Sequence, residues 1–424
     1  MRSYHVFIEL NGKQRYVGKI EGNSSEDACF SYAREYLAAN GSRSISVSLP
    51  LQEEPFSSER TKVFFDGLLP EGFMRKSIAS NMHFDEQDYL SILDHLGKEC
   101  LGALRIGEPD EDRESGYEAI SPEQVKELAA EGTTKSTEMV IKTHLSLTGA
   151  SGKVGLYYDE SNDGWYLPCG TAPSTHIVKQ SHIRLDGIVT NEQLSMLAAG
   201  KCGIDVPESF IINVGTGVDS EVLFATKRYD RTIDETSPEI GQLKRPFRIH
   251  QEDFAQAMGI ASFDKYEKAG QNYAVKMFEI IRKYAKRPLE DQLRLWNRMV
   301  FNFALGNTDA HIKNYALLYD PHLEGVSLAP AYDMISTVIY ESATRDMSFH
   351  IGGDRNLDRI REENFQSLAA EIGISKKLAM NHYDQVMDRF EVAIREAGKE
   401  LQESGFTHAG KIADRILIAR KKIL

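Results

Sequence analysis

A helix that runs into a strongly polar loop is the feature of this sequence that most constrains its fold. Five large apolar residues recur at steps of four and three residues and predict one buried helical face: Leu289, Leu293, Trp296, Val300 and Phe303. Gly306-Asn307 marks the end of this helix, and polar residues are concentrated directly after it. The apolar runs at 315–319 and 326–328 then predict a short hairpin.

Three polar residues around this predicted hairpin have the spacing that phosphoryl transfer requires. Asn314 follows Asp309 by five residues, and Asp333 lies beyond the hairpin. In protein kinases such an Asp accepts the proton of the attacking hydroxyl, whereas the Asn and the later Asp hold Mg²⁺ on the phosphates. The pattern predicts an ATP-dependent phosphotransferase with Asp309 as catalytic residue and Asn314 and Asp333 as metal ligands. The alternative is that Asp309 and Asn314 only cap turns.

A kinase of this type also needs a lysine that reaches the nucleotide phosphates from a strand. The apolar run that ends in Lys179 predicts such a strand, because a lysine on a half-buried strand is unfavourable unless it meets an anion. Glu192, at the expected start of a helix over 192–201, is its expected ion-pair partner. The alternatives are a surface lysine at 179 and a helix-capping role for Glu192.

A glycine-bearing segment precedes the Lys179 strand and is similar to a phosphate-binding loop. It is not a Walker A motif, which would need Gly in place of Leu147 and Ser or Thr in place of Val154. We expect a loop over the phosphates between two strands, with an ordinary hairpin as the alternative. Its residues are Gly149, Ala150, Ser151, Gly152 and Lys153.

The N-terminal residues alternate between apolar and polar positions and predict a small α+β unit. Asn11-Gly12 predicts the turn of a hairpin. Ser24, with Asp27 three residues later, predicts a helix start, and Asn40-Gly41 predicts the end of that helix. Alternation over 45–49 predicts a further strand.

These patterns predict an α+β, two-lobed protein-kinase-like fold with an extra small N-terminal α+β subdomain and an all-helical C-terminal lobe. The expected parts are the N-terminal subdomain (1–105), a connecting segment (106–138), a strand-rich lobe with the phosphate loop (139–230) and a helical lobe (231–424).

Composition excludes several other classes of protein. The formal net charge of −13 disfavours direct binding of nucleic acid, because phosphate contacts depend on clustered Lys and Arg. No apolar run is long enough to span a bilayer, and the first residues show no secretory signal, so we expect a cytoplasmic protein without membrane contact. Four scattered cysteines without C-x-x-C spacing argue against a zinc site and a disulfide framework: Cys29, Cys100, Cys169 and Cys202.

In several motifs the chain resembles the HipA family of bacterial serine/threonine kinases, the toxin halves of toxin–antitoxin pairs. The resemblance runs in order through nearly the whole length. Its motifs are FFDGLLPEG (64–72), LSLTGA (145–150), THIVK (175–179), KRYDR (227–231), HQED (250–253), KYE (265–267), GNTDAHIKN (306–314) and YD (332–333).

The resemblance implies ATP and Mg²⁺ as cofactors. It implies Asp309 as the catalytic residue, Asn314 and Asp333 as metal ligands, Lys179 and His311 as nucleotide contacts, and Lys227 to Tyr229 as the hinge against adenine.

The resemblance also implies regulation and partners. A serine before the phosphate loop is self-phosphorylated in the family, and Ser146 matches it. The family commonly has Gln and then Lys two residues later after Gly-Ala, whereas this chain has Ser151-Gly152-Lys153, so Ser151 is a rival site. The implied partner is HipB, a helix-turn-helix protein through which DNA is contacted indirectly. The implied substrate is an aminoacyl-tRNA synthetase, notably the glutamyl enzyme.

Two other functions compete with this interpretation. A metal-dependent phosphohydrolase could use Asp309, His311 and Asp333 as ligands. Alternatively, the chain could be a catalytically silent corepressor that works with a DNA-binding antitoxin.

Overall fold

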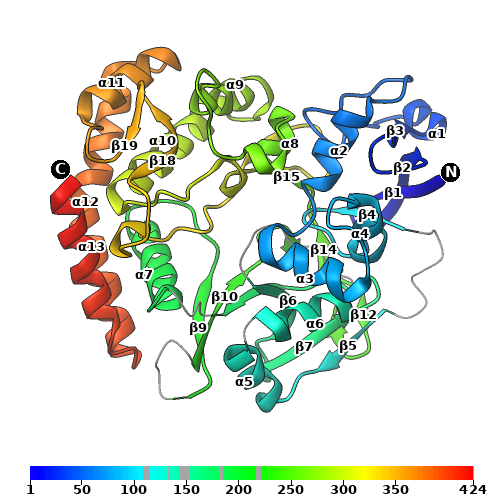
Figure 1. Ribbon diagram of the computed structural model, residues 1–424, viewed down its shortest axis with the longest axis horizontal. Helices are drawn as coiled ribbons and strands as arrows, with labels where there is room; N and C mark the ends of the chain where they lie inside the picture. Colours follow the sequence, from blue (N-terminus) through cyan, green and yellow to red (C-terminus); the bar gives the residue numbers. More distant parts are fainter. Residues whose placement is uncertain (108–114, 132, 144–151, 181–184, 216–220, 424) are drawn as a thin grey trace. The chain divides into compact units, whose positions relative to one another are not determined.

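The chain forms two compact units in a computed structural model that describes residues 1–107, 115–131, 133–143, 152–180, 185–215 and 221–423 (Figure 1). The first unit contains Met1–Gln180, Ala225–Ser262 and Leu318–Gly325. The second contains Ser181–Phe224, Phe263–Leu317 and Val326–Leu424. Each unit therefore combines segments that are distant in the sequence. No described helix has the length and apolar character needed to cross a membrane.

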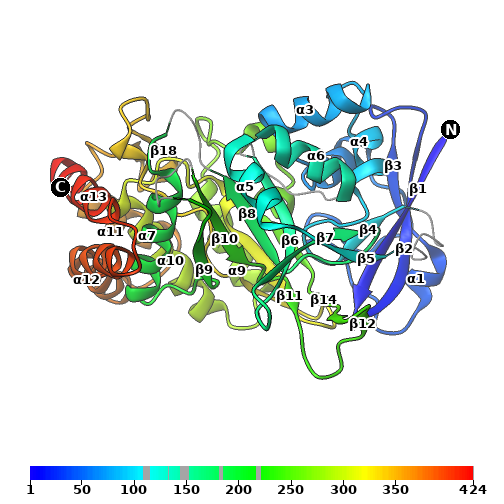
Figure 2. The ribbon, with the colours of Figure 1, turned by 90° about the horizontal axis from the view of Figure 1, so that it is seen from below.

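The N-terminal hairpin forms as predicted. Strands β1 (Arg2–Leu10) and β2 (Lys13–Gly22) pair antiparallel and form a long ribbon (Figure 2). Asn11 and Gly12 both have positive φ, at 50° and 73°, which matches the right-handed twist of a two-residue hairpin. With β3 (Cys29–Tyr32) and β4 (Leu104–Ile106) they make a four-stranded sheet in the order β3-β2-β1-β4.

Two predictions in this region are wrong. The helix expected after Ser24 is replaced by strand β3 and the short helix α1 (Arg34–Ala38). Asp27 accepts hydrogen bonds from the amides of Asn23 and Ser24, so it closes a turn and does not cap a helix. The expected strand at 45–49 is only an isolated bridge between Ser46 and Leu49. Contacts with distant residues decided both outcomes.

The rest of the first unit consists of helices and a second antiparallel sheet. In this sheet β5, β7, β6 and β8 are neighbours in that order. The predicted turn between β6 and β7 is present, and Asp163 in it has a φ of 55°. The segment 106–138, expected as a connection, contains β5, α5 and part of α6. The elements up to β8 are α2 (Ser58–Asp66), α3 (Gly72–Met82), α4 (Tyr89–Leu96), β5 (Gly116–Ala119), α5 (Pro122–Glu131), α6 (Thr133–Thr143), β6 (Lys153–Asp159), β7 (Gly164–Cys169) and β8 (His176–Gln180).

Short strands and one helix follow between residues 222 and 258. They are β10 (Val222–Lys227), β11 (Arg231–Thr232), β12 (Glu239–Ile240), β13 (Leu243–Lys244), β14 (Phe247–Arg248), β15 (Gln251–Asp253) and α8 (Phe254–Met258).

A buried cluster of ion pairs joins the N-terminal sheet of the first unit to the segment around β11 and β14. Glu99 contacts Arg228, Arg231 and Arg248 at 3.1, 2.8 and 2.6 Å. Glu9 contacts Arg248 at 2.9 Å. Burial alone would raise the pKa of the Glu99 carboxyl, but the surrounding arginines lower it to about 2. The cluster is therefore charged across the neutral pH range.

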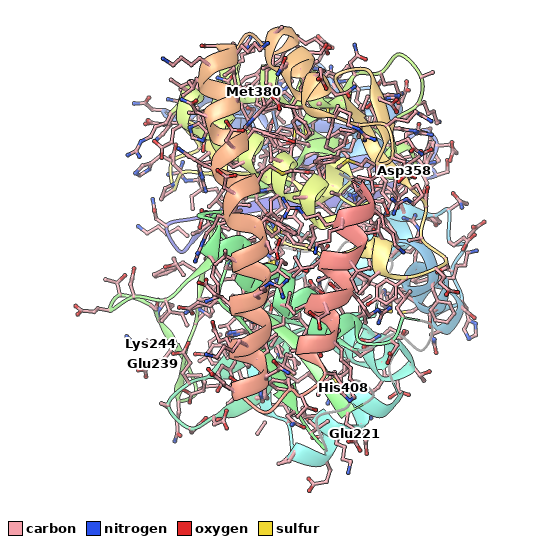
Figure 3. All side chains as sticks on the ribbon, turned by 90° about the vertical axis from the view of Figure 1, so that its left-hand side faces the viewer. Glu221, Glu239, Lys244, Asp358, Met380 and His408 are labelled. Carbon is pink, nitrogen blue, oxygen red and sulfur yellow. The ribbon has the colours of Figure 1, made fainter. Side chains whose placement is uncertain are left out.

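The second unit is mainly helical. Its elements are α7 (Ile188–Lys201), β9 (Ser209–Asn213), α9 (Tyr273–Tyr284), α10 (Pro288–Leu305), η4 (Ile312–Asn314), β17 (Val326–Leu328), η5 (Thr337–Ile339), β18 (Asp346–Ile351), β19 (Asp354–Asn356), α11 (Glu362–Glu371), α12 (Lys376–Glu403) and α13 (Ala409–Ile423). Strand β16 (Ala316–Tyr319) and β17 form the predicted hairpin. Helices α12 and α13 pack side by side (Figure 3).

Helix α10 confirms most of the predicted apolar face. Trp296, Val300 and Phe303 are fully buried. The expected face is wrong at its N-terminal end, where Leu289, the second residue of α10, is 56% exposed. Gly306 ends the helix in the left-handed conformation with a φ of 67°.

Candidate active site

The loop after α10 is held by Asn307, a buried residue in the second unit. Its side chain Nδ2 donates to Asn302 Oδ1 at 3.0 Å and to the backbone oxygen of Asp333 at 3.2 Å. Its Oδ1 accepts a hydrogen bond from the Asp309 amide at 3.2 Å. One amide therefore positions both predicted acidic residues. From the sequence Asn307 was predicted only as the end of a helix; its position two residues before Asp309 was the available signal.

Asp309 is exposed, and its carboxylate has an aromatic partner in the second unit, Tyr266. The hydroxyl of Tyr266 donates to Asp309 Oδ1 at 2.6 Å. The ring of Tyr266 packs edge-on against buried His311, with ring centroids 5.4 Å apart. A hydroxyl at a carboxylate oxygen is the interaction that a phosphoryl acceptor makes with its general base. In the sequence Tyr266 is visible only as part of the KYE motif (265–267), which gives it no role.

A hydrogen bond to the backbone fixes the side-chain amide of Asn314. Its Nδ2 donates to the backbone oxygen of Asp309 at 2.9 Å, which fixes the orientation of the amide. The side-chain Oδ1 of Asn314 then remains as the acceptor that can bind a cation. Asn314 ends the short helix η4, so its position depends on the same turn that presents Asp309.

Asp333 adopts an unusual backbone conformation. Its φ is 54°, which is unfavourable for residues other than glycine and is least costly for Asn and Asp. Such strain persists where the surroundings hold it, and it is enriched at functional sites. Tyr332 donates from its hydroxyl to the backbone oxygen of Lys313 at 2.8 Å, and the Thr308 amide donates to Thr337 Oγ1 at 2.8 Å. Hydrogen bonds on both sides of Asp333 therefore tie it to the catalytic loop.

The donor set in the second unit fits magnesium. Mg²⁺ prefers oxygen ligands, keeps several waters and is commonly held by one or two protein groups together with phosphates. The carboxylate of Asp333 and the amide oxygen of Asn314 supply two such groups. Among the described residues there is no group of three His, Cys, Asp or Glu side chains that could hold a metal ion. The hydrolase interpretation would need Asp309, His311 and Asp333 as such a cluster.

In the first unit the sheet brings two lysines together. Lys153 at the start of β6 is directly opposite Lys179 on β8 in the antiparallel register. Directly paired residues share one face of a sheet, and like charges at this distance are unfavourable unless an anion lies nearby. Both lysines were predicted as site residues from the sequence, but their pairing follows only from the strand register. Gly152 lies against the side chain of Gln180, so a larger residue would require Gln180 to move.

The KRYDR segment (227–231) has one exposed, one half-buried and three buried side chains. Lys227 is exposed and lies 3.6 Å from Glu160, and the Tyr229 hydroxyl donates to Gln251. Arg228 and Asp230, by contrast, belong to the buried ion-pair cluster. Within the predicted hinge 227–229, Arg228 is therefore a buried ion-pair residue, a role that its sequence context did not reveal.

Glu192 lies inside α7 and not at its start. The helix begins at Ile188 after Gly187, so Glu192 is its fifth residue and is buried. A helix-capping role for Glu192 is therefore wrong. Its ion pair with Lys179 stays a prediction, because the two residues belong to different units. Ser146, Gly149, Ala150 and Ser151 lie outside the described residues.

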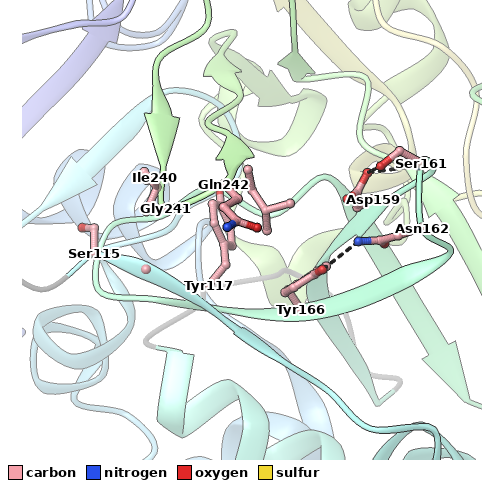
Figure 4. Close-up of a pocket in the computed structure, with 11 residues that line it drawn as sticks. Ser115, Tyr117, Asp159, Ser161, Asn162, Tyr166, Ile240, Gly241 and Gln242 are labelled. Carbon is pink, nitrogen blue, oxygen red and sulfur yellow. Dashed lines mark hydrogen bonds between the residues drawn. The ribbon is translucent and has the colours of Figure 1, made fainter.

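A polar cavity of about 630 Å³ lies elsewhere in the first unit (Figure 4). None of the predicted site residues lines it. Its lining includes Ser115, Tyr117, Asp159, Asn162, Tyr166 and Gln242.

Comparison with known proteins identifies the family. A family model named HipA-like C-terminal domain matches residues 145–394, and one named HipA N-terminal domain matches residues 9–107. A relative from Sinorhizobium fredii with a provisional kinase name, Y4mE, is 31% identical over 388 residues, which cover 88% of this chain and 87% of that protein. The serine/threonine-protein kinase toxin HipA of Shewanella oneidensis is 24% identical over 403 residues, covering 92% and 88%.

A solved structure confirms the predicted fold class. It is described as the Shewanella oneidensis MR-1 toxin–antitoxin system HipA, HipB and its operator DNA complex. The TM-score is 0.79 at 20% identity, and the match covers 98% of this chain and 97% of that one. The fold is thus the α+β, kinase-like fold of HipA. With the two family models and the full-length relatives, these findings show that the chain belongs to the HipA family.

Proposed function

We propose that this protein is an ATP- and Mg²⁺-dependent serine/threonine protein kinase. The observation that carries the proposal is the single buried amide of Asn307, which bonds the backbone of both Asp309 and Asp333. A kinase needs a base and a metal ligand in fixed relative positions, because its catalysis is mainly positioning and electrostatic stabilisation. The kinase names of full-length relatives support the same activity.

Each site residue has a defined role in this proposal. Asp309 orients the acceptor hydroxyl and accepts its proton, and Asn314 and Asp333 hold the metal ion. A Mg²⁺ held there would supply positive charge that stabilises the negative charge developing on the phosphates. Lys179 and Lys153 contact the phosphates together with the loop of Gly149, Ala150, Ser151 and Gly152, while His311, Lys227 and Tyr229 contact the rest of the nucleotide.

The test is label transfer from γ-labelled ATP to the protein itself or to an aminoacyl-tRNA synthetase. Asp309→Asn and Asp333→Asn should each reduce transfer by about 100-fold or more. Asn is the right replacement at 333, because it keeps the shape and tolerates the φ of 54°. Asp163→Asn is a matched control, since Asp163 has a φ of 55° in the turn between β6 and β7 and is not a predicted site residue.

The outcomes of this test separate the alternatives. Equal transfer by wild type and both site variants would refute the assignment of Asp309 and Asp333. A chain that binds no nucleotide would indicate a silent corepressor. Release of free phosphate without acceptor labelling would indicate a hydrolase.

The substrate, partner and regulation are finer parts of the proposal. We propose an aminoacyl-tRNA synthetase, most specifically the glutamyl enzyme, as substrate and a HipB-like helix-turn-helix antitoxin as partner. The solved HipA relative was determined with HipB and operator DNA, and an acidic chain needs a basic partner to approach DNA. Autophosphorylation at Ser146 would switch the kinase off, because a phosphoserine repels the phosphates of ATP. Mass spectrometry that finds phosphate only on Ser151 would refute this choice.

A further inference from the structure

Asn191 is a fully buried amide in the interior of α7, within the second unit. Asn is a poor residue for the interior of a helix, because its side chain competes for backbone hydrogen bonds. A buried amide is also costly unless its donors and acceptors are satisfied. The position therefore indicates a specific set of partners.

Two of the four hydrogen bonds of the Asn191 side chain are made with the backbone of Ser336. Asn191 Nδ2 donates to the backbone oxygen of Ser336 at 3.0 Å, and the Ser336 amide donates to Asn191 Oδ1 at 3.1 Å. The remaining two bonds are a donation from Nδ2 to the Tyr340 hydroxyl at 3.2 Å and an acceptance from the Ser195 hydroxyl at 3.2 Å. All the hydrogen-bonding positions of the amide are used, and both backbone groups of Ser336 are held.

Ser336 follows Asp333 by only three residues, so its position constrains the metal ligand. The Ser336 hydroxyl also donates to the backbone oxygen of Leu305 at 2.7 Å, and Asn307 holds the backbone oxygen of Asp333 at 3.2 Å. The segment 333–336 is thus fixed at one end by the catalytic loop and at the other by α7. Asp333, with its positive φ, is the first residue of this fixed segment. A conformation of this kind needs such support.

We propose that Asn191 is a positioning residue that couples helix α7 to the metal ligand Asp333. It touches neither substrate nor metal, but it fixes the backbone that carries the carboxylate. A shift or rotation of α7 would therefore change the affinity of the site for Mg²⁺. This inference deepens the proposed function and rests on its assignment of Asp333 as a metal ligand.

The experiment measures the Mg²⁺ concentration that gives half-maximal label transfer at saturating ATP. Asn191→Leu has a similar volume but cannot bond Ser336, and it should raise this concentration about tenfold or more. Asn191→Ala is the second variant, because it adds no bulk if Leu disturbs folding. Tyr340→Phe and Ser195→Ala are matched controls: each removes one bond to Asn191 and leaves both bonds to Ser336, so each should stay within about twofold of wild type.

A merely structural role would give a different result. Loss of packing alone would lower the melting temperature and the rate at saturating Mg²⁺ but would leave the half-saturating concentration unchanged. That outcome in folded Asn191 variants would overturn the proposal. Amide hydrogen exchange over 334–340, measured without nucleotide, should be faster in both Asn191 variants than in wild type, and unchanged exchange would also count against it.

Asp333→Asn separates this inference from the proposed function. If Asp333→Asn shifts the Mg²⁺ dependence and the Asn191 variants do not, only the coupling is wrong. If Asp333→Asn leaves the Mg²⁺ dependence unchanged, the metal assignment itself fails, and the coupling fails with it.

Discussion

Single polar side chains set the geometry of this site. Asn307 bonds the backbone of Asp309 and Asp333, Asn314 bonds Asp309, and Asn191 bonds Ser336. Amides suit this role because each offers both donors and acceptors in one rigid plane. In the proposed site, amide side chains position the backbone that carries the two carboxylates.

Tyr266→Phe should reduce kcat roughly tenfold and leave the KM for ATP almost unchanged. The phenol hydroxyl donates to Asp309 Oδ1 at 2.6 Å, and a hydrogen bond to a charged group is worth about 1.5–3 kcal/mol. Without it the carboxylate is less well oriented toward the acceptor. Steady-state kinetics with saturating acceptor measure the effect.

Tyr284→Phe is a suitable control for this prediction. Tyr284 ends α9 and is 37% exposed, compared with 45% for Tyr266. If kcat rises in Tyr266→Phe and not in Tyr284→Phe, the hydroxyl of Tyr266 competes with the acceptor hydroxyl for Asp309 and does not assist it.

At the scale of elements, the end of α10 places the catalytic loop. Gly306 has a φ of 67°, and a Cβ atom there would lie 2.3 Å from Cγ2 of Val338. The Thr337 hydroxyl also donates to the backbone oxygen of Gly306 at 2.9 Å. The helix end, the catalytic loop and the segment after Asp333 therefore meet at a position that only glycine fits.

Gly306→Ala should lower both stability and activity. The left-handed conformation costs about 1–2 kcal/mol for a residue with a Cβ, and the contact with Val338 adds to this cost. Gly259→Ala at the end of α8 is a matched control, because its φ is 68° and nothing lies within 4 Å of the added atom. Urea unfolding should show a loss in both variants, larger at 306, and only Gly306→Ala should slow label transfer. Equal losses would show that Val338 moves aside.

At the scale of the whole molecule, the buried ion pairs of the first unit join residues from three parts of the sequence. Glu9 lies in β1, Glu99 lies between α4 and β4, and the arginines come from 228–248. A buried charge is costly without its partners, so these distant segments are stable only together.

Glu99→Gln should destabilise the protein by about 3–5 kcal/mol at pH 7, because it leaves buried arginines without their partner. The pKa of Glu99 is about 2 in the folded protein, below its ordinary value of 4.5. Its contribution to stability is therefore present above pH 4.5 and is lost as the pH falls toward 2. Urea unfolding at pH 7 and pH 3 should show that the difference between wild type and variant is smaller at pH 3.

Glu118→Gln provides the comparison for an exposed pair. Glu118 contacts Lys142 at 2.7 Å, and both side chains are more than half exposed. Its loss should cost less than about 1 kcal/mol. If Glu99→Gln cost no more than this, the buried cluster would not be what holds the segments together.

Local patterns in the sequence predicted much of this protein. The apolar period of α10, the Asn11-Gly12 turn and the hairpin after Asn314 each depend on neighbouring residues, so they could be found without tertiary structure. The spacing of Asp309, Asn314 and Asp333 could also be found from the sequence, because only one turn and one hairpin lie between these residues.

Other features were decided only by the tertiary structure. Residues 29–32 form a strand because they pair with β2. The expected strand at 45–49 does not form, because the backbone amide of Val47 donates its hydrogen bond to the side chain of Glu252 and not to a neighbouring strand. Three further features join residues that are distant in the sequence. They are the pairing of Lys153 with Lys179, the buried ion pairs, and the hydrogen bonds between Asn191 and Ser336. Backbone period and turn chemistry are short-range properties that the sequence alone determines. Hydrogen bonds and ion pairs between remote segments exist only after folding has brought those segments together and removed them from water.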